Sequence, residues 1–306
     1  MTQFSLGIKS DPVEYRYSYE WLFAFMRDHD VHYLQLGSSF EFFSLDDSYF
    51  VDLRLAADAH GITIKSCFTA HRELGGFFWP DPRAHRVARR AYERWIEIAG
   101  ILGADYVGSN PGAVYRDRPG ERDAGIATYL DHLTDLQRFA HDHGLRALTI
   151  EPMSSRFEPP STPEEIREFG DVPARYHLEH SAVTVPVYFC GDISHGLVDE
   201  DGVVDCDHWT LFEMEIPRMA EFHFKNTDAR YGSTFGFGPV NADRGIIDLT
   251  ELRTILMRRS TDFPVNLVVG YLEIGGPKLG RDYSDPLLAD ELSTSIRAIR
   301  AVFPEL

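Results

Sequence analysis

The alternation of short apolar runs with longer amphipathic segments constrains this 306-residue chain more than any other feature. From end to end, each run typical of a strand is followed by a segment with helical periodicity. The expected strands are residues 4–9, 31–37, 62–69, 104–109, 145–151, 183–192, 220–225 and 265–273. The expected helices are residues 17–29, 49–60, 82–103, 121–143, a short helix from Thr162, 206–219, 249–259 and 286–302.

Strands that alternate with helices predict a parallel sheet whose faces are covered. Eight such units in about 250–300 residues match a (β/α)₈ barrel. A doubly wound sheet usually has fewer units and a glycine-rich phosphate turn after its first strand. Here that turn reads Lys9-Ser10-Asp11-Pro12, and no change of composition interrupts the chain. We therefore expect an α/β protein, a (β/α)₈ TIM barrel, with residues 1–306 as a single domain.

Composition excludes several classes of function. The formal net charge of −18 argues against nucleic acid as a partner, because phosphate backbones are bound by surplus Lys and Arg. The N-terminus has no signal-peptide pattern and no apolar run approaches the length that spans a membrane. Three irregularly spaced cysteines, Cys67, Cys190 and Cys206, imply no disulfide framework. We expect a cytoplasmic protein without a membrane or nucleic-acid partner.

Four side chains that can bind metal stand at or near the ends of expected strands. They are Glu151 in TIEPM, Asp192 in CGDISH, His223 in EFHFKN and Glu273 in GYLEIGG. The C-terminal ends of parallel barrel strands face one common mouth. Two Glu, one Asp and one His suit one divalent ion, Mn²⁺ first, with Mg²⁺, Co²⁺ and Zn²⁺ as alternatives. A structural ion pair explains any one of them alone, but not four in successive units.

His223 and Lys225 share one face of their strand, because side chains alternate with a period of two. Phe222 and Phe224 then lie on the other face, which suits a surface covered by helices. A His and a Lys inside a barrel are costly unless they are paired or functional. We expect both to face the barrel axis, with Lys225 as a candidate substrate-binding residue. Taken alone, His223 is also explained as a hydrogen-bonded core histidine.

These motifs resemble those of the xylose-isomerase-like TIM-barrel superfamily over essentially the whole chain. The superfamily includes ketose 3-epimerases, inosose dehydratases and isomerases, C-glycoside deglycosidase large subunits and endonuclease IV-like nucleases. Its pattern is Glu on strand five, Asp-x-x-His on strand six, a His-x-Lys-like motif on strand seven and Glu on strand eight. The resemblance implies metal ligation by Glu151, Asp192, His223 and Glu273, with His195 touching the substrate.

The resemblance also implies chemistry on a carbohydrate. A metal that chelates a ketone oxygen and the adjacent hydroxyl acidifies the C–H between them. Glu151 and Glu273 could then remove and return a proton on opposite faces of that carbon. Epimerisation, aldose–ketose isomerisation and elimination share this enediolate. We expect a metal-dependent sugar epimerase or isomerase. The alternatives are a dehydratase, a lyase that eliminates an aglycone from a 3-oxo C-glycoside with a small second subunit, a nuclease, and an inactive barrel that only binds.

This chain departs from the family patterns at several positions. His71 matches one histidine of the nucleases, but Asn110 stands where a second is expected. Relative to the 3-epimerases, Arg230 and Glu158 are each displaced by one residue. We expect these four residues to contact the substrate, together with Trp79.

Two long loops, residues 70–81 and about 226–248, combine glycines with aromatic residues. The first contains Phe77, Phe78 and Trp79, and the second contains Phe235 and Phe237. Such loops are typical of mobile lids that close over a ligand, and an oligomer contact is the equal alternative. We expect a small carbohydrate substrate and an oligomeric protein.

Overall fold

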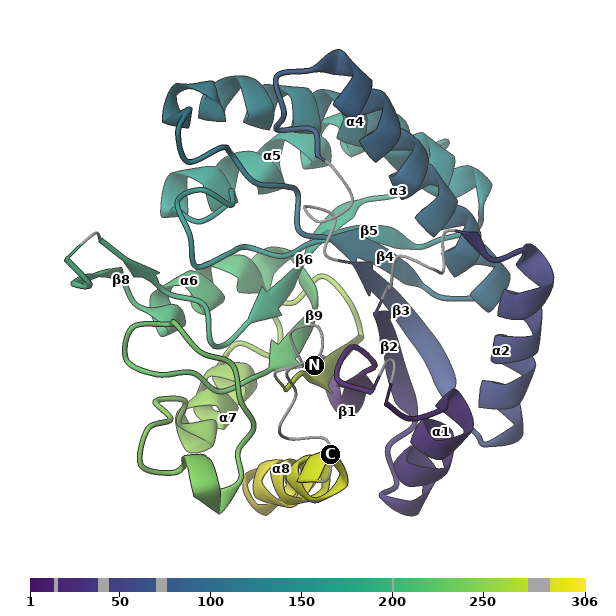
Figure 1. Ribbon diagram of the computed structural model, residues 1–306, viewed down its shortest axis with the longest axis vertical. Helices are drawn as coiled ribbons and strands as arrows, with labels where there is room; N and C mark the ends of the chain where they lie inside the picture. Colours follow the sequence, from purple (N-terminus) through teal and green to yellow (C-terminus); the bar gives the residue numbers. More distant parts are fainter. Residues whose placement is uncertain (14–15, 38–43, 70–75, 200, 275–286) are drawn as a thin grey trace. The chain divides into compact units, whose positions relative to one another are not determined.

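The computed structural model describes residues 1–13, 16–37, 44–69, 76–199, 201–274 and 287–306. Within these residues, eight strands form a closed barrel in the order β1-β10-β9-β6-β5-β4-β3-β2, with helices around it (Figure 1). Neighbouring strands such as β1 and β10, or β4 and β5, run parallel. The (β/α)₈ TIM barrel predicted from the sequence is therefore confirmed.

The elements lie close to their predicted positions. The barrel strands are β1 (Gln3–Lys9), β2 (Tyr33–Gly37), β3 (Thr63–Thr69), β4 (Tyr106–Ser109), β5 (Ala147–Ile150), β6 (Val187–Asp192), β9 (Met219–Phe224) and β10 (Leu267–Leu272). The helices are α1 (Tyr19–Asp28), α2 (Asp47–Ala59), α3 (Pro82–Leu102), α4 (Arg122–Asp142), α5 (Pro163–Glu179), α6 (His208–Glu215), α7 (Leu249–Arg258) and α8 (Leu288–Val302).

Local capping signals set several helix ends. The Asp81 side chain accepts a hydrogen bond from the backbone N–H of Arg83 at the start of α3, with Pro82 at the first helical position. Gly103 ends this helix in the left-handed conformation, with a φ of 73°. Thr162 and Glu165 form a capping box at the start of α5. These ends depend on residues a few positions apart, so the sequence predicts them well.

Two of the expected helices differ from the structure: the helix after Thr162 and the helix over residues 206–219. The helix that follows Thr162 is not short, because α5 runs for 17 residues and continues through Pro173. Residues 206–219 are not one helix. Cys206 ends the hairpin of β7 (Leu197–Val198) and β8 (Val204–Cys206), and α6 begins only after it. Strands of two and three residues are too short to show a periodicity.

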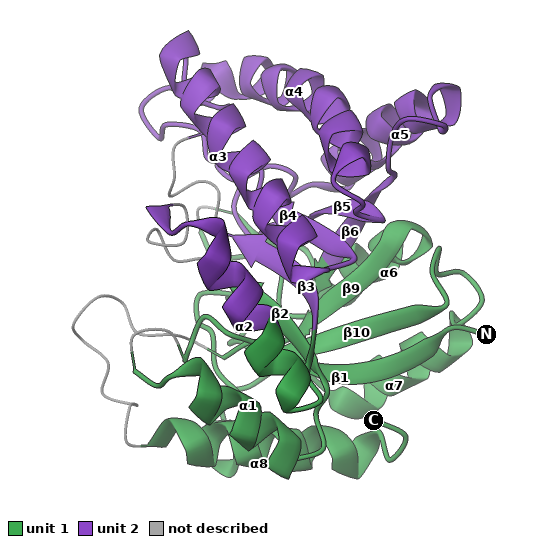
Figure 2. Cartoon of the chain, turned by 90° about the vertical axis from the view of Figure 1, so that its right-hand side faces the viewer, with its two compact units in different colours: residues 1–37, 55–63, 191–306 green, residues 38–54, 64–190 purple. Residues whose placement is uncertain are grey.

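The described chain divides into two compact units (Figure 2). The first comprises Met1–Gly37, Leu55–Thr63 and Gly191–Leu306, and the second comprises Ser38–Arg54 and Ile64–Cys190. In the first unit, Phe222 packs edge-on against Phe212 of α6 and Phe224 packs against Phe303. This confirms the predicted outward face of β9. The assignment of one domain to the whole chain stays a prediction.

Two further properties of the described residues bear on the expectations. No helix among them is long and apolar enough to cross a membrane. Cys67 and Cys190 are buried free thiols, and Cys206 is a partly exposed free thiol.

Candidate metal centre

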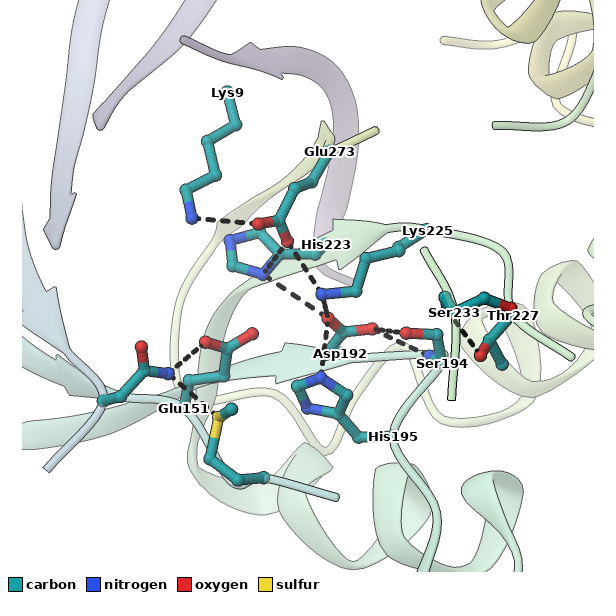
Figure 3. A network of polar contacts seen from close by, with 12 residues as sticks. Lys9, Glu151, Asp192, Ser194, His195, His223, Lys225, Thr227, Ser233 and Glu273 are labelled. Atoms are coloured by element: carbon teal, nitrogen blue, oxygen red, sulfur yellow. Dashed lines mark hydrogen bonds and ion pairs between the residues drawn. The ribbon is translucent and has the colours of Figure 1, made fainter. Parts of the chain in front are cut away.

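Three of the predicted ligands meet within the first unit. Asp192 ends β6, His223 lies on β9, and Glu273 directly follows β10. Their ligand atoms lie within 4.8 Å of one another (Figure 3). Asp192 and His223 are 2% and 0% exposed, so little water competes for these atoms. The cluster of Asp, His and Glu side chains could bind a metal ion.

A tight turn holds the Asp192 carboxylate. Its Oδ1 accepts hydrogen bonds from the backbone N–H of Ser194 at 2.8 Å and from the Ser194 hydroxyl at 2.7 Å. Oδ2 lies 3.3 Å from His195 Nε2 and 3.8 Å from His223 Nδ1. The Asp-x-x-His spacing therefore turns one oxygen toward its own backbone and the other toward the cluster.

Tyr231 packs against the same turn from the loop after β9. A Cβ atom on Gly196 would lie 2.2 Å from Cζ of the Tyr231 ring, so only glycine fits there. Tyr231 itself has a φ of 54°, which is unusual for a residue with a side chain. Its hydroxyl lies 3.3 Å from His208 Nδ1. This contact places a ring against the residue that follows His195.

The orientation of the His223 ring is set by Gln35 on β2. Nε2 of His223 donates a hydrogen bond to Oε1 of Gln35 at 2.8 Å. In the neutral ring Nδ1 then carries the lone pair, and this nitrogen lies 3.1 Å from Glu273 Oε2. A histidine held through one nitrogen in this way presents the other as a metal ligand.

Glu273 lies between two ammonium groups. Lys9 Nζ is 3.1 Å from its Oε1, and Lys225 Nζ is 3.1 Å from its Oε2. Burial alone would raise the pKa of Glu273, but Lys225 and Lys9 hold it far below its ordinary value. Burial would likewise raise the pKa of Asp192, but the His195 imidazole and the Lys225 ammonium keep it well below its ordinary value.

Asp11 is a second acidic partner of Lys9. Its Oδ2 lies 3.0 Å from Lys9 Nζ. Burial raises the pKa of Asp11, Lys9 lowers it, and the nearby Glu273 charge raises it further, so that it ends above its ordinary value. The site therefore holds several carboxyl groups in a small volume, which is a setting that favours cations.

Glu151 belongs to the second unit and directly follows β5. It is 4% exposed, and its Oε2 accepts a hydrogen bond from Asn110 Nδ2 at 2.5 Å. The same amide nitrogen lies 2.9 Å from Met153 Sδ. Glu151 is the fourth of the ligands predicted from the sequence.

The donor set fits a divalent cation. Carboxylate oxygens and an imidazole nitrogen suit Mn²⁺, Mg²⁺, Co²⁺ and Zn²⁺. Among the described residues, no donor meets Asp192 Oδ2 in hydrogen-bond geometry, although Lys225 Nζ lies 2.6 Å away as an ion pair. A buried carboxylate oxygen of this kind has lone-pair capacity left for a metal.

The other residues that were predicted to bind the substrate lie in different parts of the structure. Lys225 lies in the cluster, and Asn110 contacts Glu151. Glu158 is half-buried in the loop after β5. Arg230 is exposed, and its guanidinium would lie 3.5 Å from a Cβ on Gly202 in the hairpin turn. His71 lies outside the described residues.

The first aromatic loop differs from its expected form. Phe77 and Phe78 are only 1% and 2% exposed, so they are core residues rather than lid residues. Phe77 contacts Tyr129, and Phe78 fills the space left by Gly112 and Gly125. Trp79 is the exception. It is 38% exposed and stacks on Tyr115, with ring centroids 5.8 Å apart.

The second aromatic loop is fastened at several points. Asn226 and Phe235 form an antiparallel bridge, and the backbone N–H of Phe237 donates to the Ser295 hydroxyl at 3.0 Å. Arg244 lies over the Phe235 ring, 4.0 Å from its centroid. Phe235 is 4% exposed and therefore anchors the loop.

Sequence reasoning missed three residues that shape this site: Gln35, Lys9 and Ser194. Gln35 is a lone amide between two leucines in a buried strand, which is a usable signal. Lys9 ends β1 in the same way that Asp192 ends β6, so the strand-end rule applied to Glu151 would also have found it. Ser194 carries no signal beyond its place in the DISH turn.

The family model of the xylose isomerase-like TIM barrel matches residues 23–271. The chain therefore belongs to the xylose isomerase-like TIM barrel family. The resemblance inferred from the strand-end motifs is confirmed. No curated protein sequence matches the chain significantly.

Solved structures of similar fold include several sugar epimerases. D-Psicose 3-epimerase from Clostridium cellulolyticum H10 is 16% identical with a TM-score of 0.67, covering 97% of this chain and 99% of its own. The 3-keto-D-glucoside 4-epimerase from E. coli is 14% identical with a TM-score of 0.63, covering 97% and 100%. The IolI protein with a bound zinc atom is 15% identical with a TM-score of 0.66, covering 98% and 97%. At these identities the likeness shows the fold alone.

Proposed function

We propose that this protein is a divalent-metal-dependent sugar epimerase or isomerase whose substrate passes through an enediolate. The observation that carries the proposal is the gathering of Asp192, His223 and Glu273 in the first unit. Glu151 is the fourth proposed ligand. Family membership and the two epimerases of the same fold support a carbohydrate substrate.

The four ligands would hold one cation, Mn²⁺ first, with Mg²⁺, Co²⁺ or Zn²⁺ as alternatives. The zinc in the IolI structure supports a divalent ion without choosing between them. When bound, such an ion supplies Lewis-acid polarisation of a ketone oxygen, which acidifies the neighbouring C–H.

Glu151 and Glu273 are the proposed proton-transfer pair. Asn110 holds one oxygen of Glu151, which orients its carboxylate. Lys9 and Lys225 keep Glu273 ionised, which is the form that a general base requires, and the same two ammonium groups weaken it as a base while they contact it. One glutamate removes the proton from the substrate carbon and the other returns it.

Several further residues are proposed to contact the substrate. His195 is 11% exposed at its side chain and would orient a substrate oxygen. Lys225 and Asn110 lie next to the carboxylates and could hydrogen-bond hydroxyl groups. Glu158, Arg230, His71 and Trp79 remain proposed substrate-binding residues.

Elimination from a 3-oxo glycoside is the second candidate. The exposed stack of Trp79 and Tyr115 favours it, because two aromatic faces suit an aromatic aglycone. The E. coli epimerase that acts on a 3-keto-glucoside supports including such substrates. Co-purification of a small second subunit would favour this lyase over the epimerase.

The test is a panel of ketoses and 3-oxo-glycosides, supplied with each divalent ion in D₂O and followed by product analysis. We expect deuterium at the carbon next to the carbonyl, and the product separates an epimer or isomer from a released aglycone. Asp192→Asn should lose both the metal and the turnover, while Glu158→Gln should keep the metal. Turnover without C–H exchange would rule out the enediolate.

A further inference from the structure

Two ammonium groups enter the metal-binding cluster, and each engages a different set of oxygens. Lys9 Nζ contacts Glu273 Oε1 at 3.1 Å and Asp11 Oδ2 at 3.0 Å. Lys225 Nζ contacts Glu273 Oε2 at 3.1 Å and Asp192 Oδ2 at 2.6 Å. Figure 3 shows Lys225 directed at the Asp192 carboxylate and Lys9 at the far oxygen of Glu273.

The oxygens that Lys225 engages are the ones that face the ligating nitrogen. Glu273 Oε2 lies 3.1 Å from His223 Nδ1, and Asp192 Oδ2 lies 3.8 Å from the same nitrogen. An ion bound by these three residues would use the same two oxygens. Lys9 contacts the other oxygen of Glu273, Oε1, and it contacts Asp11 Oδ2 rather than Asp192.

An ammonium group and a divalent cation would compete for these lone pairs. The ammonium and the cation are both positively charged, so they repel each other. The Lys225 and Asp192 side chains are only 9% and 0% exposed, so solvent does little to screen the repulsion between the ammonium and the cation. Lysine carries its charge on a flexible four-carbon chain and can move more readily than the two carboxylates.

We propose that Lys225 is an internal competitor of the metal ion, whose ammonium leaves Asp192 and Glu273 when a divalent cation binds. This inference rests on the proposed metal centre. It makes Lys225 a positioning residue with two arrangements. In one, its ammonium neutralises the ligand carboxylates. In the other, it is released from them and is available to a substrate oxygen.

The test compares Mn²⁺ affinity in three proteins by calorimetric titration after removal of metal with chelator. They are the wild type, Lys225→Met and Lys9→Met. Each variant removes one ammonium from the same site, so the change in charge is matched. We expect Lys225→Met to bind Mn²⁺ at least about tenfold more tightly than the wild type and at least about threefold more tightly than Lys9→Met, whose gain measures the general effect of removing a positive charge.

Two outcomes of this titration overturn the inference while leaving the metal centre intact. One is a wild-type affinity that Lys225→Met leaves unchanged or weakens. The other is an equal gain in both variants, which would be a general effect of charge. If none of the three proteins binds Mn²⁺, the proposed metal centre fails, and the competition falls with it.

A second measurement uses the wild type and avoids any loss of folding in the variants. The chain has four lysines, Lys9, Lys65, Lys225 and Lys278, so selective ¹³Cε-lysine labelling gives few signals. The Lys225 signal is identified by its loss in Lys225→Met. We expect Mg²⁺ to shift it strongly and to leave Lys65 in place. A Lys225 signal that does not move at saturating Mg²⁺ would refute the displacement.

Discussion

Gln35 Oε1 accepts a hydrogen bond from His223 Nε2 at 2.8 Å, although 188 positions separate the two residues in the chain. The bond places the proton on Nε2 and fixes the ring orientation in which Nδ1 faces Glu273 and Asp192. A candidate metal ligand on β9 is thus oriented by an uncharged amide on β2.

Replacing Gln35 with Met should weaken divalent-metal binding by about 10- to 100-fold, the usual effect of losing a residue that orients a metal ligand. Methionine keeps the length of the side chain but accepts no comparable hydrogen bond, so the His223 ring can turn. Calorimetric titration with Mn²⁺ measures the change. Gln35→Glu keeps an acceptor for Nε2–H and serves as the control. An affinity that Gln35→Met leaves untouched would contradict this role.

Glu151→Gln and Glu273→Gln should each reduce turnover by at least about 10²-fold, because an amide cannot accept the proton in general acid–base catalysis. Metal content, measured by elemental analysis, separates loss of the ion from loss of the base. Glu164→Gln is the control, since it makes the same chemical change at an exposed glutamate outside the proposed ligand and substrate-binding sets. If either variant retains full turnover, that glutamate does not transfer the proton.

Phe78 and Trp79 are neighbours in the chain with opposite environments, so their substitutions should have opposite effects. Phe78→Ala should lower the free energy of unfolding by about 3–5 kcal/mol, because a buried aromatic ring is lost. Trp79→Ala should leave stability nearly unchanged and lower kcat/KM about five- to tenfold. Urea unfolding measures the stability of both variants, and steady-state kinetics measures kcat/KM. If Trp79→Ala instead separates an oligomer in sizing experiments, this loop is an assembly surface.

Lys225→Met should be less stable than the wild type at pH 7 by about 3–5 kcal/mol, the cost of removing one partner from a buried ion pair. The Lys225 ammonium helps to keep the pKa values of Asp192 and Glu273 low in the folded state. Stability from a lowered carboxyl pKa is complete above the unfolded pKa of about 4 and is lost as the pH falls toward the folded value.

Acidification should therefore narrow the difference in the free energy of unfolding between the wild type and Lys225→Met, because the unpaired carboxylates of the variant can take up protons. Urea unfolding in chelator at pH 7, 5 and 4 measures this trend. A difference that stays constant or widens toward low pH would show that Lys225 does not set these pKa values.

The strand-end rule identified the candidate ligands because their positions follow from local periodicity. Each of Glu151, Asp192 and Glu273 stands at the boundary between an apolar run and a turn, and parallel barrels align such boundaries at one mouth. The same rule would have identified Lys9. Alternation in β9 likewise predicted that His223 and Lys225 share a face opposite the two phenylalanines.

Partners distant in the sequence were not predictable in this way. The glycines and aromatics of the first loop suggested a lid, but Phe78 packs into a space that Gly112 and Gly125 leave open, and this depends on how three segments meet. The same holds for Gln35 with His223 and for Lys9 with Glu273. Periodicity reports which face a side chain takes within its own element. The residue that it meets across the barrel depends on strand order and register, which are properties of the assembled sheet.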